Sequence, residues 1–145
     1  MIYIGTEKED LAEQWASERL GIKASPSVYK ALSGVDKEGN FSCVVLLTNF
    51  TARNVDLNIV GEKYWATPKN TIKMFNGVFN TIFHELNAVR ATALIAKSNV
   101  TCQNFVEHLG FLYEGSMRKA YDNDEDMQIY GFLKEEYTSH GWCRS

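Results

Sequence analysis

The sequence has few of the residues that mark secreted, fibrous or disordered proteins. Its 145 residues include three cysteines (Cys43, Cys102 and Cys143), two prolines and ten glycines, and 45% of them are hydrophobic. An odd number of widely spaced cysteines argues against a disulfide framework. The chain has no Cys-x-x-Cys or His-Glu-x-x-His spacing, so structural zinc is not expected. We therefore predict a packed, reduced, cytoplasmic protein that holds no metal.

Long apolar runs and an excess of positive charge are also missing. No stretch approaches the roughly 20 apolar residues of a transmembrane helix, and Met1–Gly5 lacks the basic region and long apolar core of a signal peptide. The net charge is -3, whereas a general nucleic-acid binder carries a basic excess. The composition thus predicts one domain over residues 1–145, with neither a membrane nor a nucleic acid as partner.

Hydrophobic periodicity predicts alternating strands and helices. Expected strands cover residues 1–5, 28–35, 41–48, 55–60, 88–97, 111–121 and 127–133. Expected helices run from a Thr6–Glu9 capping box to Gly21, from Thr67 to Leu86, and from Asn99 to Leu109. Residues 41–48 are apolar enough for a strand buried on both faces. This order predicts an α/β (α+β) fold with a mixed sheet of six to seven strands flanked by helices.

The segment from Asn99 to Gly115 carries the most specific pattern. It reads Asn-Val-Thr-Cys-Gln-Asn-Phe-Val-Glu-His-Leu-Gly-Phe-Leu-Tyr-Glu-Gly, a short amphipathic helix that ends at Gly110 and leads directly into a strand. This resembles the helix-to-strand signature of the GNAT superfamily of acyl-CoA-dependent N-acetyltransferases. Other matching pieces at the right spacing are Phe83, Arg90 and the segment 130–137, which reads Tyr-Gly-Phe-Leu-Lys-Glu-Glu-Tyr. The resemblance is strongest over residues 55–137 and is nearest to the ribosomal-protein N-terminal acetyltransferases.

The resemblance implies transfer of an acetyl group from acetyl-CoA to a primary amine, by direct attack in a ternary complex. In this family the pyrophosphate lies at a helix N-terminus, and the pantetheine arm lies between two splayed strands. It implies that Lys69, Asn70 and Thr71 bind the pyrophosphate. It also implies that Asn99 and Phe105 face the coenzyme.

The resemblance leaves the proton-transfer groups open. A carboxylate near the fourth strand, Asp56 or Glu62, would accept the proton of the amine through water. Cys102 stands three residues after Asn99, where the N-terminal acetyltransferase branch often has a serine, and its thiol would donate to the departing thiolate. Ordinary structural roles are the alternatives, namely a solvated strand face for the carboxylates and core packing for Cys102.

The chain departs from the family at the phosphate-binding loop. The family pattern is Gln/Arg-x-x-Gly-x-Gly/Ala, whereas residues 66–71 read Ala-Thr-Pro-Lys-Asn-Thr. Both glycines are missing, although they let the backbone approach the pyrophosphate closely. Pro68 also removes one N–H donor. Lys69 supplies a positive charge in partial compensation, and an ordinary helix start is the alternative interpretation of this segment.

Other functions and partners stay open at this point. A catalytically inactive structural or interaction protein of GNAT fold is the main alternative, and such proteins occur among tailed-phage proteins. A GNAT-like nucleobase modifier is the third, and the acidic balance counts against it. The acceptor would be a small-molecule or peptide amine, which the acidic loop 122–126 would attract. The aromatic residues Tyr137, His140 and Trp142 predict either packing on the sheet or a homodimer contact.

Overall fold

The computed structural model describes residues 2–6, 9–20 and 28–139. Three features predicted from the sequence lie outside these ranges: the helix end at Gly21, the aromatic residues His140 and Trp142, and the third cysteine, Cys143. The helices of the described ranges include none that is long and apolar enough to cross a bilayer.

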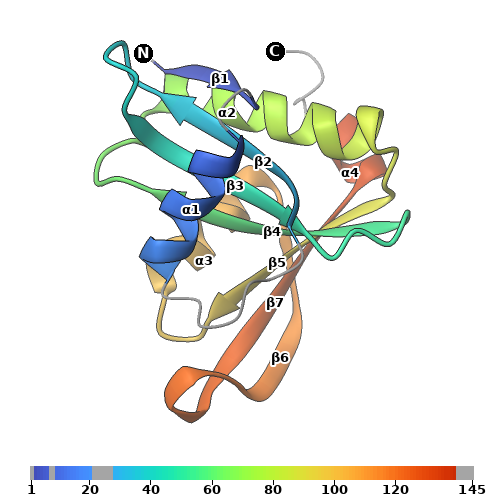
Figure 1. Ribbon diagram of the computed structural model, residues 1–145. Coiled ribbons are helices and arrows are strands. Elements are labelled where there is room, and N and C mark those ends of the chain that lie inside the picture. Colours follow the sequence, from blue (N-terminus) through green and yellow to red (C-terminus); the bar gives the residue numbers. More distant parts are fainter. Residues whose placement is uncertain (1, 7–8, 21–27, 140–145) are drawn as a thin grey trace.

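Seven strands form one mixed sheet in the order β1-β2-β3-β4-β5-β7-β6 (Figure 1). The strands are β1 (Tyr3–Gly5), β2 (Val28–Val35), β3 (Phe41–Thr48), β4 (Asn54–Gly61), β5 (Arg90–Ala96), β6 (Leu112–Tyr121) and β7 (Glu125–Leu133). All neighbouring pairs are antiparallel except β4 and β5, which run parallel. A parallel pair needs a crossover, and the segment containing α2 supplies it. The predicted fold class and mixed sheet are confirmed.

Helices cover both faces of this sheet (Figure 1). They are α1 (Glu9–Leu20), α2 (Pro68–Asn80), α3 (Val100–Leu109) and α4 (Lys134–Ser139). A π-helical turn over Thr81–Glu85 extends α2, and a 3-10 turn over Asp122–Asp124 joins β6 to β7. The helix predicted to run to Leu86 is thus α-helical only to Asn80, and it closes with a bond from the Leu86 N–H to the Thr81 carbonyl.

The larger core lies between the sheet and the helices α2, α3 and α4. Its centre is an aromatic cluster around Phe79, which is fully buried. Among the described residues, the ring of Phe79 lies within 6.2 Å, centroid to centroid, of the rings of Phe75, Phe83, Phe111, Phe132 and Tyr137. Such offset and edge-on contacts stabilise a core beyond the area they bury.

Helix α1 covers the opposite face of β2, β3 and β4 with small side chains. Ala12 and Ala16 are fully buried there, against Val44 and Leu46 of β3. The sequence pattern of Leu11 and Trp15 predicts one apolar face for this helix. Trp15 packs against this smaller core as predicted, whereas Leu11 is 57% exposed and does not. Alanine lets the helix backbone approach the sheet closely, so Ala12 and Ala16 face β3 where Leu11 does not. Strand β3 is buried on both faces, as predicted.

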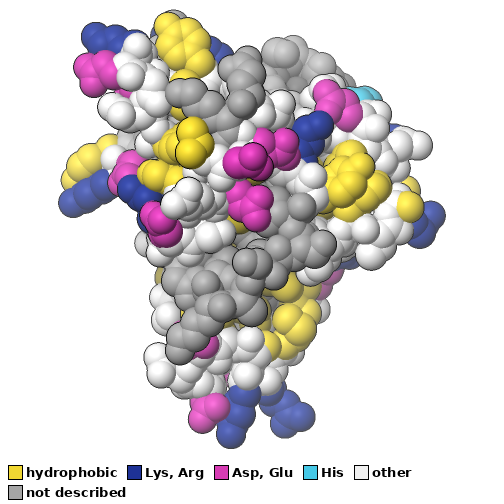
Figure 2. All heavy atoms as spheres, in the orientation of Figure 1, with side chains coloured by type: hydrophobic (Ala, Val, Ile, Leu, Met, Phe, Trp, Pro, Cys, Tyr) yellow, Lys and Arg dark blue, Asp and Glu magenta, His cyan; other side chains and the backbone are white. Residues whose placement is uncertain are grey.

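The β6–β7 hairpin projects beyond the other strands at one end of the molecule (Figure 1). Strand β6 is the edge of the sheet, and most of its residues are exposed. Acidic and basic side chains are mixed over the face shown in Figure 2. The hairpin returns β7 alongside β5, which places the 3-10 turn near the gap described next.

Candidate functional site

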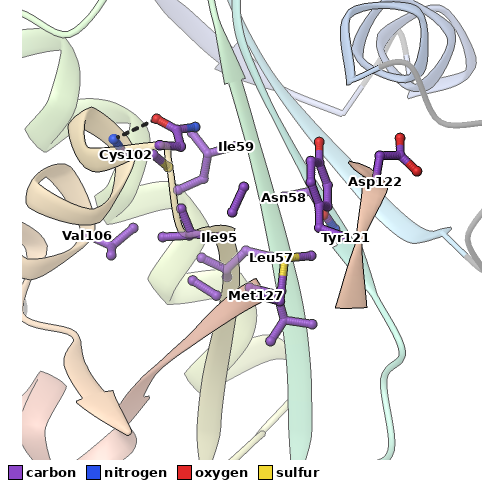
Figure 3. Close-up of a pocket in the computed structure, with 13 residues that line it drawn as sticks. Leu57, Asn58, Ile59, Ile95, Cys102, Val106, Tyr121, Asp122 and Met127 are labelled. Carbon is purple, nitrogen blue, oxygen red and sulfur yellow. Dashed lines mark hydrogen bonds between the residues drawn. The ribbon is translucent and has the colours of Figure 1, made fainter. Parts of the chain in front are cut away.

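Strands β4 and β5 separate partway along their length. They pair from Asn54 opposite Arg90 to Leu57 opposite Ala93, and beyond that point both strands continue unpaired to each other. A cavity of about 340 Å³ lies in the gap (Figure 3). Its lining consists of Leu57, Asn58, Ile59, Ala93, Leu94, Ile95, Ala96, Asn99, Cys102, Val106, Tyr121, Asp122 and Met127.

Residues from both faces of the sheet line the cavity. Successive side chains of a strand point to opposite faces. Leu57 and Ala93 belong to the core beneath α3, whereas Asn58 and Leu94 point to the other face. Figure 3 shows Cys102 on one side of the cavity and Tyr121 and Asp122 on the other. Two molecules that enter from opposite faces would therefore meet in the gap.

Backbone groups of β4 also face this gap. Residues Asn58–Gly61 pair with β3 on one side and have no partner in β5 on the other. The N–H and C=O groups of an antiparallel strand alternate between its two neighbours. Half of those groups in Asn58–Gly61 thus point into the gap, where they can bind an extended ligand or a developing oxyanion.

Helix α3 is fixed at both ends by its sequence. The Asn99 side-chain oxygen accepts a hydrogen bond from the Cys102 N–H at 3.1 Å, which is an N-cap. Gly110 ends the helix with φ 118°, a conformation that favours glycine. The Gln103 side chain ties the helix to β5 by donating to the Ala96 and Lys97 carbonyls. Asn99 and Cys102 are thereby held at the cavity wall.

The Cys102 thiol faces the cavity in its protonated form. Burial raises the pKa of this thiol above its ordinary value. Among the described residues, no histidine or acidic side chain pairs with this thiol to stabilise its thiolate form. The site therefore offers a neutral thiol, which can donate a proton but is a poor nucleophile.

Phe105 lies beside the cavity and not in its wall. Its ring contacts Trp65 at 5.9 Å and Phe75 at 5.7 Å between centroids, both edge to face. Trp65 belongs to the loop between β4 and α2, so the two rings bridge that loop and α3. The structure thus places Asn99 in the cavity wall and Phe105 outside it, although the resemblance implies that both face the coenzyme.

The start of α2 holds the three residues predicted to bind phosphate. Thr67 is the N-cap, and its hydroxyl accepts from the Asn70 N–H at 3.2 Å. The Asn70 side chain donates to the Trp65 carbonyl at 2.9 Å, and the Thr71 N–H donates to the Thr67 carbonyl. Lys69 is exposed and Thr71 is buried. These residues lie at one helix end, outside the wall of the cavity.

The two carboxylates predicted as bases do not line the cavity either. Asp56 lies in the paired part of β4, where the side-chain amides of Asn49 and Asn54 both donate to it at 3.0 Å. Glu62 forms an ion pair with Arg19 of α1 at 2.9 Å. Each carboxylate already has donors that belong to the fold.

Three polar wall residues were not among the predicted site residues, namely Asn58, Tyr121 and Asp122. Asn58 carries a visible signal, because it alternates with the core residues of β4. Asp122 belongs to the acidic loop 122–126, which was predicted to attract a cationic acceptor. Tyr121, in contrast, carries no local sequence signal for a site. Its place depends on how the β6–β7 hairpin folds back toward β4, which is a property of the whole sheet. In the described residues, no three His, Cys, Asp or Glu side chains gather as they would around a metal ion.

Comparison with known proteins gives a likeness of structure without a likeness of sequence. No protein-family model matches the chain, and no curated protein sequence matches it. The spermidine/spermine N-acetyltransferase SpeG from Vibrio cholerae is similar in structure, with a TM-score of 0.66 and 18% identity over 90% of this chain and 78% of that one. An acetyltransferase of the GNAT family from Bacillus anthracis has a TM-score of 0.61 and 16% identity over 72% and 66%. The chain has the fold of the GNAT acyl-CoA N-acyltransferases.

Proposed function

We propose that this protein is an N-acyltransferase that moves an acetyl group from a thioester, acetyl-CoA, to a primary amine. The observation that carries the proposal is the cavity between β4 and β5, where α3 forms one wall and Tyr121 and Asp122 form the other. A cavity lined from both faces of the sheet suits two substrates that react directly in one complex. The GNAT fold supports the same reaction class by analogy.

The reaction needs one bond to form and one to break. The nitrogen of the neutral amine attacks the thioester carbonyl, an N–C bond forms, and the C–S bond breaks with the electron pair leaving on sulfur. The amine gives up one proton, and the departing thiolate takes up one. The products are an acetamide and a free thiol, so no oxidant or further reactant is required.

The donor would occupy the α3 side of the cavity. Its pantetheine arm would add alongside the unpaired edge of β4 as an extra strand. An N–H group of this edge would bind the oxygen of the carbonyl as negative charge develops on it. Cys102 would protonate the thiolate, since its raised pKa keeps the proton on sulfur at neutral pH.

The acceptor would enter on the side of Tyr121 and Asp122. A primary amine is an ammonium ion at neutral pH and must lose a proton before it attacks. We assign Asp122 to attract this ion and to accept its proton, directly or through water, because Asp122 is the carboxylate in the cavity wall. Asp56, two residues before Asn58, would support the strand rather than accept the proton.

The acceptor is a small or peptidic primary amine. The structural neighbour SpeG acts on spermidine, a small amine with several positive charges. The resemblance to ribosomal-protein N-terminal acetyltransferases points instead to the amino end of a peptide. A panel of both kinds, polyamines and short peptides, therefore forms the acceptor screen.

Thiol release tests the proposal. Purified protein is incubated with acetyl-CoA and each amine, free thiol is followed with a chromogenic reagent, and the amide is identified by mass spectrometry. Asp122→Asn should lower kcat/KM by about 10²- to 10⁴-fold if Asp122 removes a proton. Cys102→Ser should retain more activity than Cys102→Ala, because a hydroxyl can still donate a proton. Asp124→Asn, next to the site but outside its wall, is the matched control.

An inactive interaction protein of the same fold is the second candidate. The observation that favours it is the start of α2, where protein oxygens already bind the groups that would hold a phosphate. Absence of thiol release above the uncatalysed rate with every amine would contradict the enzyme and favour this candidate.

A further inference from the structure

The indole of Trp65 lies on the backbone of β4 just beyond the cavity. A side-chain carbon added to Gly61 would stand 2.1 Å from two atoms of this indole, so the ring occupies that position. Ile59, two residues earlier, lines the cavity. The indole also contacts the ring of Phe105 on α3. Trp65 therefore fills the space between the end of β4 and α3, beyond the cavity wall and next to the start of α2.

The loop that carries Trp65 is fixed to the start of α2. The Trp65 carbonyl accepts from the Thr67 N–H and from the Asn70 side chain, both at 2.9 Å. The Trp65 N–H donates to the Glu62 carbonyl at 3.1 Å. These bonds fix the backbone from which the indole reaches Gly61, and they need no ligand.

The start of α2 is also poorly suited to an anion. Helix N-termini bind phosphate through backbone N–H groups that lack partners. Pro68 has no N–H, and the N–H groups of Asn70 and Thr71 already donate to Thr67. Among the described residues, this leaves the Lys69 N–H as the first-turn donor without an acceptor. The carbonyl of Trp65, which is itself partly negative, also lies at this helix end.

We infer that the acyl donor is recognised by its acyl-pantetheine end, and that Trp65 excludes the nucleotide end of coenzyme A from the start of α2. This rests on the proposed function. The cavity holds the thioester and the arm along β4, and the indole stops the path that would continue to the helix. A pantetheine thioester that carries no nucleotide would therefore serve as well as acetyl-CoA.

Calorimetric titration tests the inference with three probes: coenzyme A, pantetheine, and adenosine bisphosphate as the nucleotide half alone. For the unchanged protein, we expect dissociation constants for coenzyme A and pantetheine within about threefold of each other, and no heat with the nucleotide. Trp65→Ala should open the path to the N–H and the positive charge of Lys69, the groups still available to a phosphate there, and so make coenzyme A bind about tenfold tighter than pantetheine. Trp15→Ala, a tryptophan on the opposite face of the sheet, is the matched control and should keep the ratio near one.

Gly61→Ala provides a second variant if Trp65→Ala does not fold. Its added methyl group would displace the indole. It should therefore raise the ratio of the pantetheine dissociation constant to the coenzyme A dissociation constant, as Trp65→Ala does. A ratio of tenfold or more in the unchanged protein, or binding of the nucleotide alone, would overturn the inference. So would a ratio that neither variant changes, or an unchanged protein that binds neither thiol.

The amine assay is scored separately, so the two failures can be told apart. The inference fails alone if acetyl-CoA is consumed by a protein that binds coenzyme A much tighter than pantetheine. The proposed function fails alone if both thiols bind equally and no amide forms with any amine.

Discussion

Arg90 and Glu114 form a two-pronged ion pair that crosses directly over Gly131. The guanidinium donates to both carboxylate oxygens, at 2.8 and 3.2 Å, and links β5 to the bulged edge strand β6 across β7. A side-chain carbon at position 131 would stand 2.4 Å from the Glu114 carboxylate and 2.7 Å from the Arg90 guanidinium. Three separate pieces of the sequence resemblance thus meet in one structural contact, away from the cavity wall.

Replacement of Gly131 by alanine should therefore break this pair. The side chains are 28% and 39% exposed, so we expect a loss of only about 1 kcal/mol in the free energy of unfolding. Urea denaturation of a double-mutant cycle checks the cause. In a Glu114→Ala background, the same Gly131→Ala change should cost much less, and an equal cost in both backgrounds would contradict the explanation.

The aromatic cluster predicts a large effect of Phe79→Ala. This ring is fully buried and contacts the other rings of the cluster, so its removal leaves a cavity that the sheet cannot close. We expect a loss of about 3–5 kcal/mol in the free energy of unfolding, measured by urea denaturation. Tyr64→Ala, at a position 83% exposed, should change it by no more than about 0.5 kcal/mol. Similar values for the two variants would be inconsistent with this core.

Asn99 has two separable roles, as a helix cap and as a cavity wall. Asn99→Ala should lower the free energy of unfolding by about 1 kcal/mol, because the Cys102 N–H loses its acceptor. Asn99→Asp keeps the cap and should keep the stability, while it adds a charge at the cavity. Asn104→Ala, an exposed position of the same helix, is the control and should not destabilise. A stable Asn99→Ala protein would show that the cap is dispensable.

Burial of the two described cysteines predicts how they react with pH. Because the pKa of the Cys102 thiol is raised, its alkylation rate should keep rising above about pH 8.5, where an exposed thiol levels off. The fully buried Cys43, whose pKa is also raised, should stay protected while the protein is folded. Peptide-resolved mass spectrometry after iodoacetamide pulses measures each site. If the pH midpoint of Cys102 alkylation lay at or below that of an exposed thiol, the prediction would be refuted.

The raised pKa of the Cys102 thiol also predicts how the free energy of unfolding changes with pH. Folding favours the neutral thiol, so its contribution is fully present below the thiol pKa of the unfolded chain. The contribution is lost as the pH rises above that value, when the unfolded chain releases its protons first. The free energy of unfolding should therefore fall in this alkaline range, and by less in Cys102→Ala.

Several elements were predictable because their signals are local. The strands 28–35 and 41–48 have the predicted bounds, since apolar runs there are interrupted by the turn around Gly39. The caps of α2 and α3 were visible at Thr67 and Gly110, where hydroxyl and glycine chemistry decides the helix end. The side of α1 that faces the sheet was not fully predictable. The alanine positions and the leucine position follow similar helical periods, and only the packing of the helix on the sheet decides which of them is buried.

The sequence by itself determined the order of the seven strands and the first three helices, and the two ends of α3, because each depends on hydrophobic period and capping within a few residues. Only the tertiary structure decided which polar groups share the cavity. It brought Tyr121 and Asp122 opposite Cys102 through the β6–β7 hairpin, and it left Asp56 and Glu62 with other partners. It also laid Trp65 on Gly61. Contacts between residues far apart in the chain depend on the packing of the whole sheet, which no local pattern encodes.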